Sequence, residues 1–276
     1  MLIWLVLIPL IAAALIGLCK APARPTALLS ASLTLALGIW ALVSFDGCSS
    51  CWSRFEGMDL QLTLAPALSK VMLLLTILVT FATVLGTNPP QGGEASWYNS
   101  ALLISAGATG AFLSDNIISF FAFHELALIP TFVMIGLYGR GDRRTTAWRA
   151  TLYLGLASMV LLAALLMIGT QAGFTFSGLK DFMASGRELA HAELIGALLI
   201  AGFGTLISLF PFHSWAAPAY ASAPAPVAMM HAGVLKKFGL YGLFMFQPLM
   251  ETGFLPWTNI LLVLLCLLYT SPSPRD

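Results

Sequence analysis

The chain has 276 residues, of which 59% are hydrophobic and only 9% are charged. A soluble domain carries about 25% charged residues, so the charges of this chain could not cover the surface of a water-soluble globule. Its formal net charge of +1 also provides no basic surface for binding phosphates. These values exclude a soluble domain, a disordered chain and a nucleic-acid-binding protein, and they indicate an integral membrane protein.

Long Leu-rich apolar blocks predict membrane-spanning helices, because an outer-membrane barrel would show strands of about 10 alternating residues. A helix needs about 20 mostly apolar residues to cross the hydrocarbon core. The expected fold class is therefore all-α, a polytopic bundle of about nine transmembrane helices. The predicted spans are 2–18, 27–45, 68–86, 100–113, 117–138, 150–170, 194–210, 225–246 and 257–269.

Basic residues in the loops predict the orientation, because Lys and Arg remain on the cytoplasmic side. They follow the first span at Lys20 and Arg24, and they follow the fifth span between positions 140 and 149. If each block crosses once, both loops lie on one side and the N-terminus lies outside. The first block lacks a basic n-region and a cleavage site, so we expect a retained helix and not a signal peptide.

Two loops on the predicted outer side carry further features. Cys48 and Cys51 form a C-x-x-C pair, which either closes a disulfide in an oxidising compartment or stays as two free thiols. A metal ion would need two more ligands than this pair supplies. The loop at 171–192 is rich in apolar residues and predicts a short interfacial helix.

The block at 257–269 is followed by the residues Thr-Ser-Pro-Ser-Pro-Arg-Asp at 270–276. This stretch resembles translated sequencing-adaptor sequence. We therefore expect 248–269 to be a truncated ninth helix and 270–276 to be a non-native tail, which is excluded from the fold prediction.

Ionisable residues at bilayer depth are the first candidates for function, since each costs about 2.5–3.5 kcal/mol on insertion scales. Glu125 lies in the fifth span next to His124, and Lys236 and Lys237 lie in the eighth span near His231. The alternative for Glu125 is a neutral, hydrogen-bonded acid, and the alternative for either lysine is snorkelling to the interface. Adjacent lysines point about 100° apart on a helix, so only one of them can face a polar interior.

Prolines interrupt the chain between the seventh and eighth spans. They occur in the stretch Phe-Pro-Phe-His-Ser-Trp at 210–215 and at Pro218, Pro224 and Pro226. Unwound backbone at membrane depth is tolerated only inside protein or along a wet cavity, and discontinuous helices mark ion pathways in transporters. We expect a broken seventh helix with His213 on the pathway, and the alternative is a Pro-rich turn at the interface.

Several motifs that would indicate a bound group are missing from the sequence. It contains no phosphate-binding or dinucleotide-binding glycine motif, no four-cysteine cluster and no histidine pair at haem-ligand spacing within the spans. We therefore expect no cofactor, no metal and no redox centre in this chain. A sparse line of Glu, Lys and His remains, which suits the movement of protons.

The stretches at 120–139 and 210–242 are similar to the antiporter-like membrane subunits of proton-translocating NADH–quinone oxidoreductase (respiratory complex I), of the chain M type. The first stretch resembles the aromatic-rich fifth helix of that family, with its Glu five residues before a Pro. The second resembles the broken seventh helix and the eighth. The resemblance implies N-terminal helices at 1–98 and a proton-translocating core at 99–247. The family fold has two inverted five-helix repeats, of which this chain would hold the first.

The resemblance also implies roles for single residues. Glu125 matches the fifth-helix Glu that pairs with a buried Lys, Lys237 matches the eighth-helix Lys that passes protons along the central axis, and His213 matches the His beyond the helix break. The family's seventh-helix Lys falls on Leu206, so Glu125 lacks its usual counter-charge. Either Lys236 or Lys237 substitutes, or the chain scaffolds its complex and does not pump. The smaller departures are Ser208 in place of a Pro, Ala217-Pro218 in place of Pro-Asp and Tyr220 in place of a His.

The implied function is that of a multi-pass subunit in a bacterial plasma membrane, which moves protons while quinone is reduced elsewhere in the complex. Its implied partners are the other membrane subunits and the lipid bilayer, with no direct binding of NADH. The alternatives are a subunit of a multi-subunit cation/proton antiporter or of a membrane-bound hydrogenase, and a non-pumping structural paralogue. The residues leave open whether H⁺ or Na⁺ is carried.

Overall fold

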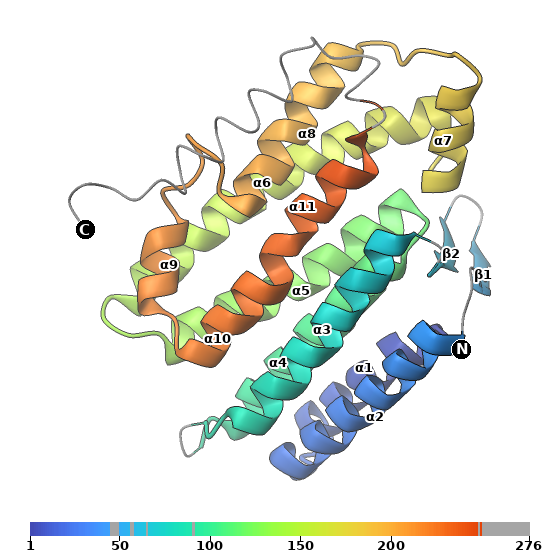
Figure 1. The fold of residues 1–276 in the computed structure, drawn as a ribbon. Coiled ribbons are helices and arrows are strands. Elements are labelled where there is room, and N and C mark those ends of the chain that lie inside the picture. The colour runs from blue at the N-terminus through green and yellow to red at the C-terminus, as the bar shows by residue number, and fades with distance from the viewer. Residues whose placement is uncertain (45–49, 56–57, 65, 90–91, 248, 250–276) are drawn as a thin grey trace.

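The computed structural model describes residues 1–44, 50–55, 58–64, 66–89, 92–247 and 249. These residues fold into a bundle of helices with one small antiparallel hairpin (Figure 1), which confirms the all-α membrane fold class. The hairpin is a feature that the apolar pattern did not predict. The elements are α1 (Ile3–Gly17), α2 (Ala23–Ser44), β1 (Ser50–Phe55), β2 (Met58–Leu62), α3 (Ala67–Gly86), α4 (Glu94–Leu113), α5 (Ile117–Tyr138), α6 (Arg143–Ala172), α7 (Phe176–Ala184), α8 (Ala192–Ile207), α9 (Ala216–Ser222), α10 (Ala225–Met230), the π-helix η1 (His231–Leu235) and α11 (Lys236–Met245).

Four helices in the described part of the chain are long and apolar enough to cross a membrane, namely α2, α3, α5 and α6. Helices α1 and α8 are shorter but also apolar. The predicted ninth span, the tail at 270–276 and Cys48 lie outside the described residues. The predicted count of nine spans is therefore not confirmed, and the pairing of Cys48 with Cys51 stays a prediction.

Two helices begin earlier than the apolar pattern indicated. Helix α6 begins at Arg143 and not near 150, because the Asp142 side chain accepts a hydrogen bond from Thr145 N (3.3 Å) and caps a polar first turn. Helix α4 begins at Glu94 and not at 100. Hydropathy underestimates α4, because it is rich in small Ala, Gly and Ser residues that are buried against other helices.

The loops gather at two ends of the bundle (Figure 1). At the hairpin end, the turn between α4 and α5 joins β2 and the segment before α7, since Asp115 N donates to Gln61 O and Ile117 N donates to Phe174 O, each at 2.8 Å. At the basic end, Arg140 N donates to Ser222 O at 2.7 Å, which ties the α5–α6 loop to the end of α9. The α1–α2 turn lies at this same end. The two basic loops therefore share one end, as the sequence predicted.

The chain breaks between α8 and α9, and α7 forms a short helix within the 171–192 loop, both as predicted. The eighth predicted span is not one regular helix. It consists of α10, the π-helix η1 and α11 in direct succession, so its backbone changes its winding immediately before Lys236. Sequence pattern does not predict this π-helical turn.

Helices α4 and α5 approach each other most closely at Gly107. A Cβ atom at this position would lie 2.6 Å from Phe123 O and 2.9 Å from Ala127 N, which are backbone atoms of α5. Small residues at a helix crossing allow backbones to come this close in membranes. The contact sets the position of the α5 segment that carries His124 and Glu125.

We predict that Gly107→Ala destabilises the protein by about 1–3 kcal/mol, because the added methyl group must push α4 and α5 apart. The matched control is Gly155→Ala in α6, where an added Cβ would meet nothing within 4 Å. Thermal unfolding of the full-length protein in detergent, followed by size-exclusion chromatography, measures both variants. Equal midpoints for the two variants would contradict the close α4–α5 contact.

Candidate functional site

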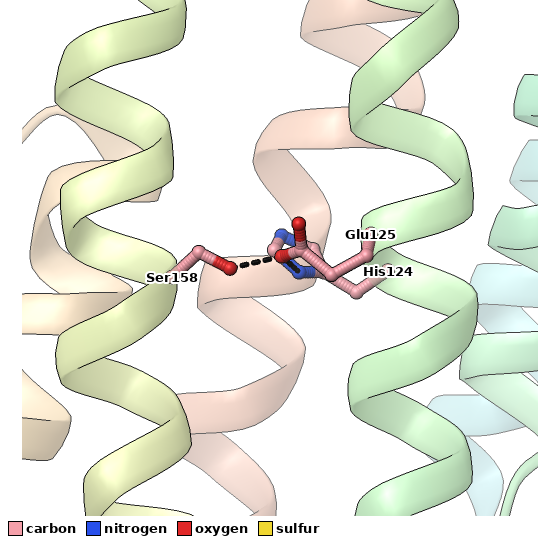
Figure 2. Close-up of polar contacts among 3 residues, drawn as sticks. All are labelled: His124, Glu125 and Ser158. Atoms are coloured by element: carbon pink, nitrogen blue, oxygen red, sulfur yellow. Dashed lines mark hydrogen bonds and ion pairs between the residues drawn. The ribbon is translucent and has the colours of Figure 1, made fainter.

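Glu125 lies in the third turn of α5, and its carboxylate contacts a hydroxyl of α6 and the neighbouring imidazole (Figure 2). Ser158 Oγ of α6 donates a hydrogen bond to Glu125 Oε1, and His124 Nδ1 lies 3.3 Å from the same oxygen. Asn116 fixes the start of α5, because its side chain accepts hydrogen bonds from Ile118 N (2.9 Å) and Ser119 N (3.1 Å). A hydroxyl and an imidazole therefore meet one carboxylate oxygen inside an apolar bundle.

The Glu125 side chain is 32% exposed and opens into a cleft of about 160 Å³ between α5 and α6. Apart from Glu125, the hydroxyls of Thr131 and Thr151 are the polar side-chain groups among its described lining residues. A half-buried acid with one hydroxyl donor is compatible with either charge state, so both interpretations of Glu125 from the sequence remain open.

His124 is the residue that reaches from this carboxylate towards α11. Its side chain is 1% exposed, and its ring meets the ring of Phe238 edge-on with centroids 5.1 Å apart. Its Nε2 atom has no hydrogen-bond partner among the described residues. The sequence indicated His124 only as a neighbour of Glu125. The structure places its imidazole between Glu125 and the helix that carries both lysines.

The two lysines of α11 differ in their surroundings. Lys236 Nζ lies over the ring of Tyr220 on α9, 5.0 Å from its centroid, which is a cation–π contact. Lys237 is also half-buried. Among the described residues, Lys237 and Glu125 do not form an ion pair with each other, so the predicted carboxylate–ammonium pair is not a direct contact in the structure.

Leu206, which the sequence resemblance matches to a family Lys, is 4% exposed and belongs to the apolar core. A Cβ atom at Gly239 of α11 would lie 3.0 Å from Leu206 Cβ and 2.7 Å from Phe203 O. Helices α8 and α11 therefore pack tightly at this point. The apolar Leu206 side chain fits this tight contact between α8 and α11. Position 206 therefore provides no cation for Glu125.

The helix break between α8 and α9 is braced by side chains. Trp215 Nε1 donates to Thr205 O at 3.1 Å, and Ser214 Oγ lies 2.9 Å from the hydroxyl of Tyr153 on α6. Ser208 adopts a left-handed conformation with φ of 63°. The Trp215 bond reaches a backbone carbonyl at the break, as a membrane interior requires, and the Ser214–Tyr153 bond joins the break to α6. His213 lies in the break, half-buried, with its ring stacked on that of Phe210 at 5.5 Å.

A second polar cluster lies beside the lysines. The hydroxyl of Tyr220 is 3.0 Å from His231 Nδ1, and His231, in the π-helix η1, is 4% exposed. From the sequence, His231 was only a neighbour of the lysines with no predicted role, and Ser158 was not predicted to take part. An isolated Ser in an apolar span was the only signal for Ser158. The contact between Tyr220 and His231 depends on the break, which no local pattern predicts.

The fold and the site together define a class of protein: a polytopic membrane protein with buried ionisable groups next to discontinuous helices, which is the arrangement of ion-translocating membrane proteins. Comparison with known proteins identifies the family. Residues 114–271 match the transmembrane family described as NADH:quinone oxidoreductase/Mrp antiporter. The chain belongs to this family, which confirms the resemblance seen in the sequence.

The chain is 33% identical over 199 residues to a NAD(P)H-quinone oxidoreductase chain 4 of Microcystis aeruginosa, a match that covers 70% of this chain and 34% of that protein. Among solved structures, a chain of respiratory complex I from Thermus thermophilus superposes with a TM-score of 0.83 at 26% identity, over 97% of this chain and 57% of that chain. A chain of the Mrp complex from Dietzia sp. shares the fold, with a TM-score of 0.80 at 23% identity, over 95% of this chain and 29% of that chain. The chain thus spans about a third of the length of the curated relatives that it matches.

We predict that Trp215→Phe lowers the unfolding midpoint, because Thr205 O loses the indole donor and keeps only Ser208 N, at a cost of about 0.5–1.5 kcal/mol. Trp148→Phe in α6 is the matched control, since Trp148 is 52% exposed and loses the same volume. Differential scanning fluorimetry of the detergent-solubilised full-length protein compares the two. A midpoint that is as high in Trp215→Phe as in the control would show that this hydrogen bond does not brace the break.

Proposed function

We propose that this chain is part of a membrane subunit of an NADH–quinone oxidoreductase-type complex and that it moves protons through the interior of its helix bundle. Membership of the family supports the kind of complex, and the structural similarity to respiratory complex I extends over 97% of the chain. The proposed core comprises residues 99–247, which include the buried ionisable residues and the helix break.

The observation that carries the proposal is the position of His124. Its Nδ1 is 3.3 Å from Glu125 Oε1, while the ring packs against Phe238, the residue that follows Lys237 on α11. A neutral imidazole has one nitrogen that accepts and one that donates, so a ring in this place can take a proton on one side and release it on the other. His124 thereby links Glu125 to the lysines without a direct ion pair.

In the proposed path, Glu125 and His124 exchange protons with Lys237, Lys236 contributes a second ammonium on the same helix, and His213 receives protons in the helix break. Ser158 positions the Glu125 carboxylate and is not itself a carrier. Unwound backbone between α8 and α9 supports the role of His213, because such segments are tolerated at membrane depth where they line a pathway or lie inside protein.

The proposed orientation puts the N-terminus outside and the basic end in the cytoplasm of a bacterial cell. The shared end of the two basic loops supports this orientation through the positive-inside rule. The proposed partners are other membrane subunits of the complex, the lipid bilayer and protons. In this proposal NADH and quinone react on other subunits, and this chain holds no cofactor or metal.

One alternative is a structural subunit that holds its complex together without pumping. Another is a subunit of a cation/proton antiporter or of a membrane-bound hydrogenase. The apolar packing of Leu206 favours a non-pumping subunit, because a buried cation is missing where the related family has one. The fold similarity to a chain of the Mrp complex is compatible with an antiporter. The proposal above has the stronger support, since Glu125, His124 and two lysines are retained in the interior.

We predict that Glu125→Gln and Lys237→Ala in the full-length, assembled complex each reduce proton translocation coupled to NADH oxidation by about tenfold or more, because positioned proton carriers contribute about 10²–10⁴-fold. Glu94→Gln, at an exposed position in the first turn of α4, is the control. Acidification of inverted membrane vesicles, normalised to the rate of NADH oxidation, is the measurement. Normal pumping by both variants would dismiss the proposed function and favour a scaffolding subunit.

We predict that Leu206→Lys lowers the amount of assembled complex and does not raise pumping, because an ammonium at this 4% exposed position would replace apolar contacts. Leu206→Met, which keeps the site apolar, is the control and should assemble normally. Native gel electrophoresis of solubilised membranes measures assembly. A gain in pumping by Leu206→Lys would instead mean that the missing cation limits transport.

A further inference from the structure

Tyr220 and His231 form a polar pair beside Lys236, and the proposed path does not use this pair. Tyr220 belongs to α9, which ends at the basic end of the bundle, where Ser222 Oγ donates to Arg140 O at 2.8 Å. His231 begins the π-helix, and Lys236 begins α11. The cluster therefore lies between the lysines of α11 and the basic end.

The π-helical turn explains why His231 and Lys236 act on the same neighbour. In a regular α-helix, residues five apart point about 140° from each other. In a π-helix the backbone bond runs from i to i+5, which brings residues five apart onto the same side. Both side chains consequently meet Tyr220: His231 Nδ1 at its hydroxyl (3.0 Å) and Lys236 Nζ over its ring (5.0 Å to the centroid). Single π-turns inside helices are frequent at functional sites.

The second ring nitrogen of His231, Nε2, lies in buried surroundings. The residue is 4% exposed, its ring packs against Trp215 at 5.4 Å between centroids, and its Nε2 has no hydrogen-bond partner among the described residues. A buried polar atom without a partner is costly, so its retention calls for an explanation in function. In the Nδ1–H tautomer the imidazole donates to the Tyr220 oxygen and leaves Nε2 free to accept a proton, so His231 keeps this hydrogen bond after Nε2 is protonated.

We propose that His231, positioned by Tyr220, exchanges a proton with Lys236 and forms a branch of the proton path towards the basic end. In this step the Lys236 ammonium releases one proton to His231 Nε2, which leaves a neutral amine and an imidazolium. The flexible four-carbon stem of Lys236 allows its head group to move between the Tyr220 ring and the imidazole. Two cations on one face of a helix repel each other in a medium of low dielectric, so the pair holds a single excess proton and passes it on.

This inference rests on the proposed function, and its test separates the two. We expect His231→Ala in the full-length, assembled complex to lose about tenfold or more of its proton translocation per NADH oxidised. Added imidazole should restore a large part of the loss in the vesicle assay. Pyrazole, which has nearly the same shape but takes no proton near neutral pH, should restore nothing.

Tyr220→Phe provides a second variant that keeps the aromatic ring and its contact with Lys236. We expect a severalfold loss of pumping, because a protonated Nδ1 would then lack its acceptor. Its matched control is Tyr138→Phe, which removes a hydroxyl that donates to Gly93 O (2.6 Å) at the end of α5, outside the proposed path, and which should pump normally.

Full pumping by His231→Ala and Tyr220→Phe, or equal rescue by imidazole and pyrazole, would overturn the branch and leave His231 as a packing residue. If Lys237→Ala and Glu125→Gln still fail to pump in the same assay, the proposed function stands without this branch. If those two variants also pump normally, both proposals are wrong.

Discussion

The structure depends on how a carboxylate is held at bilayer depth. An unpartnered charge is strongly disfavoured in hydrocarbon, and Glu125 is accommodated because Ser158 donates to its Oε1 and His124 Nδ1 lies 3.3 Å away. These contacts join α5 to α6 on one side. On the other side, the backbone approach at Gly107 joins α5 to α4 and turns the His124 ring towards α11. The same part of α5 thus determines how this helix packs against α4 and α6 and how the Glu125 carboxylate is held.

A cluster of aromatic rings packs in the interior of the bundle towards its hairpin end. At the hairpin end, rings from α4, α5, α7, α8 and α11 contact one another, and the Tyr241 hydroxyl lies 3.0 Å from Ser69 Oγ and 3.2 Å from Phe112 O. The polar cluster of Tyr220 and His231 lies towards the basic end. The rings in contact are Phe112, Phe120, Phe176, Phe203, Phe238, Tyr241 and Phe246.

Much of this architecture follows from sequence because hydrocarbon imposes simple rules. Long apolar blocks predicted α2, α3 and α5, and the prolines after position 210 predicted the break after α8. The start of α4 was missed because its first residues include Glu94, Ser96 and Asn99, which lower the hydropathy. Glu125, Lys236 and Lys237 stood out as ionisable residues within apolar spans. Ser158 and the π-helical turn did not stand out in the sequence. Their importance depends on contacts between helices, which no local sequence pattern shows.

Leu206 shows how a site can depart from its family while its fold persists. The chain retains the complex I-like fold over 97% of its length, yet an apolar side chain occupies the position where the related family has a Lys. Tight α8–α11 packing at Gly239 accommodates that side chain. Within α8–α11, the described lysines are Lys236 and Lys237 on α11, both half-buried, so the proposed path relies on this helix and its neighbours.

The most direct test is a high-resolution electron cryomicroscopy structure of the full-length, assembled complex in lipid nanodiscs. We predict that Glu125 and His124 face the protein interior and that ordered water connects His124 Nε2 with the ammonium group of Lys237. A Glu125 side chain in contact with lipid tails, or unbroken apolar packing between His124 and Lys237, would contradict proton transfer through this bundle.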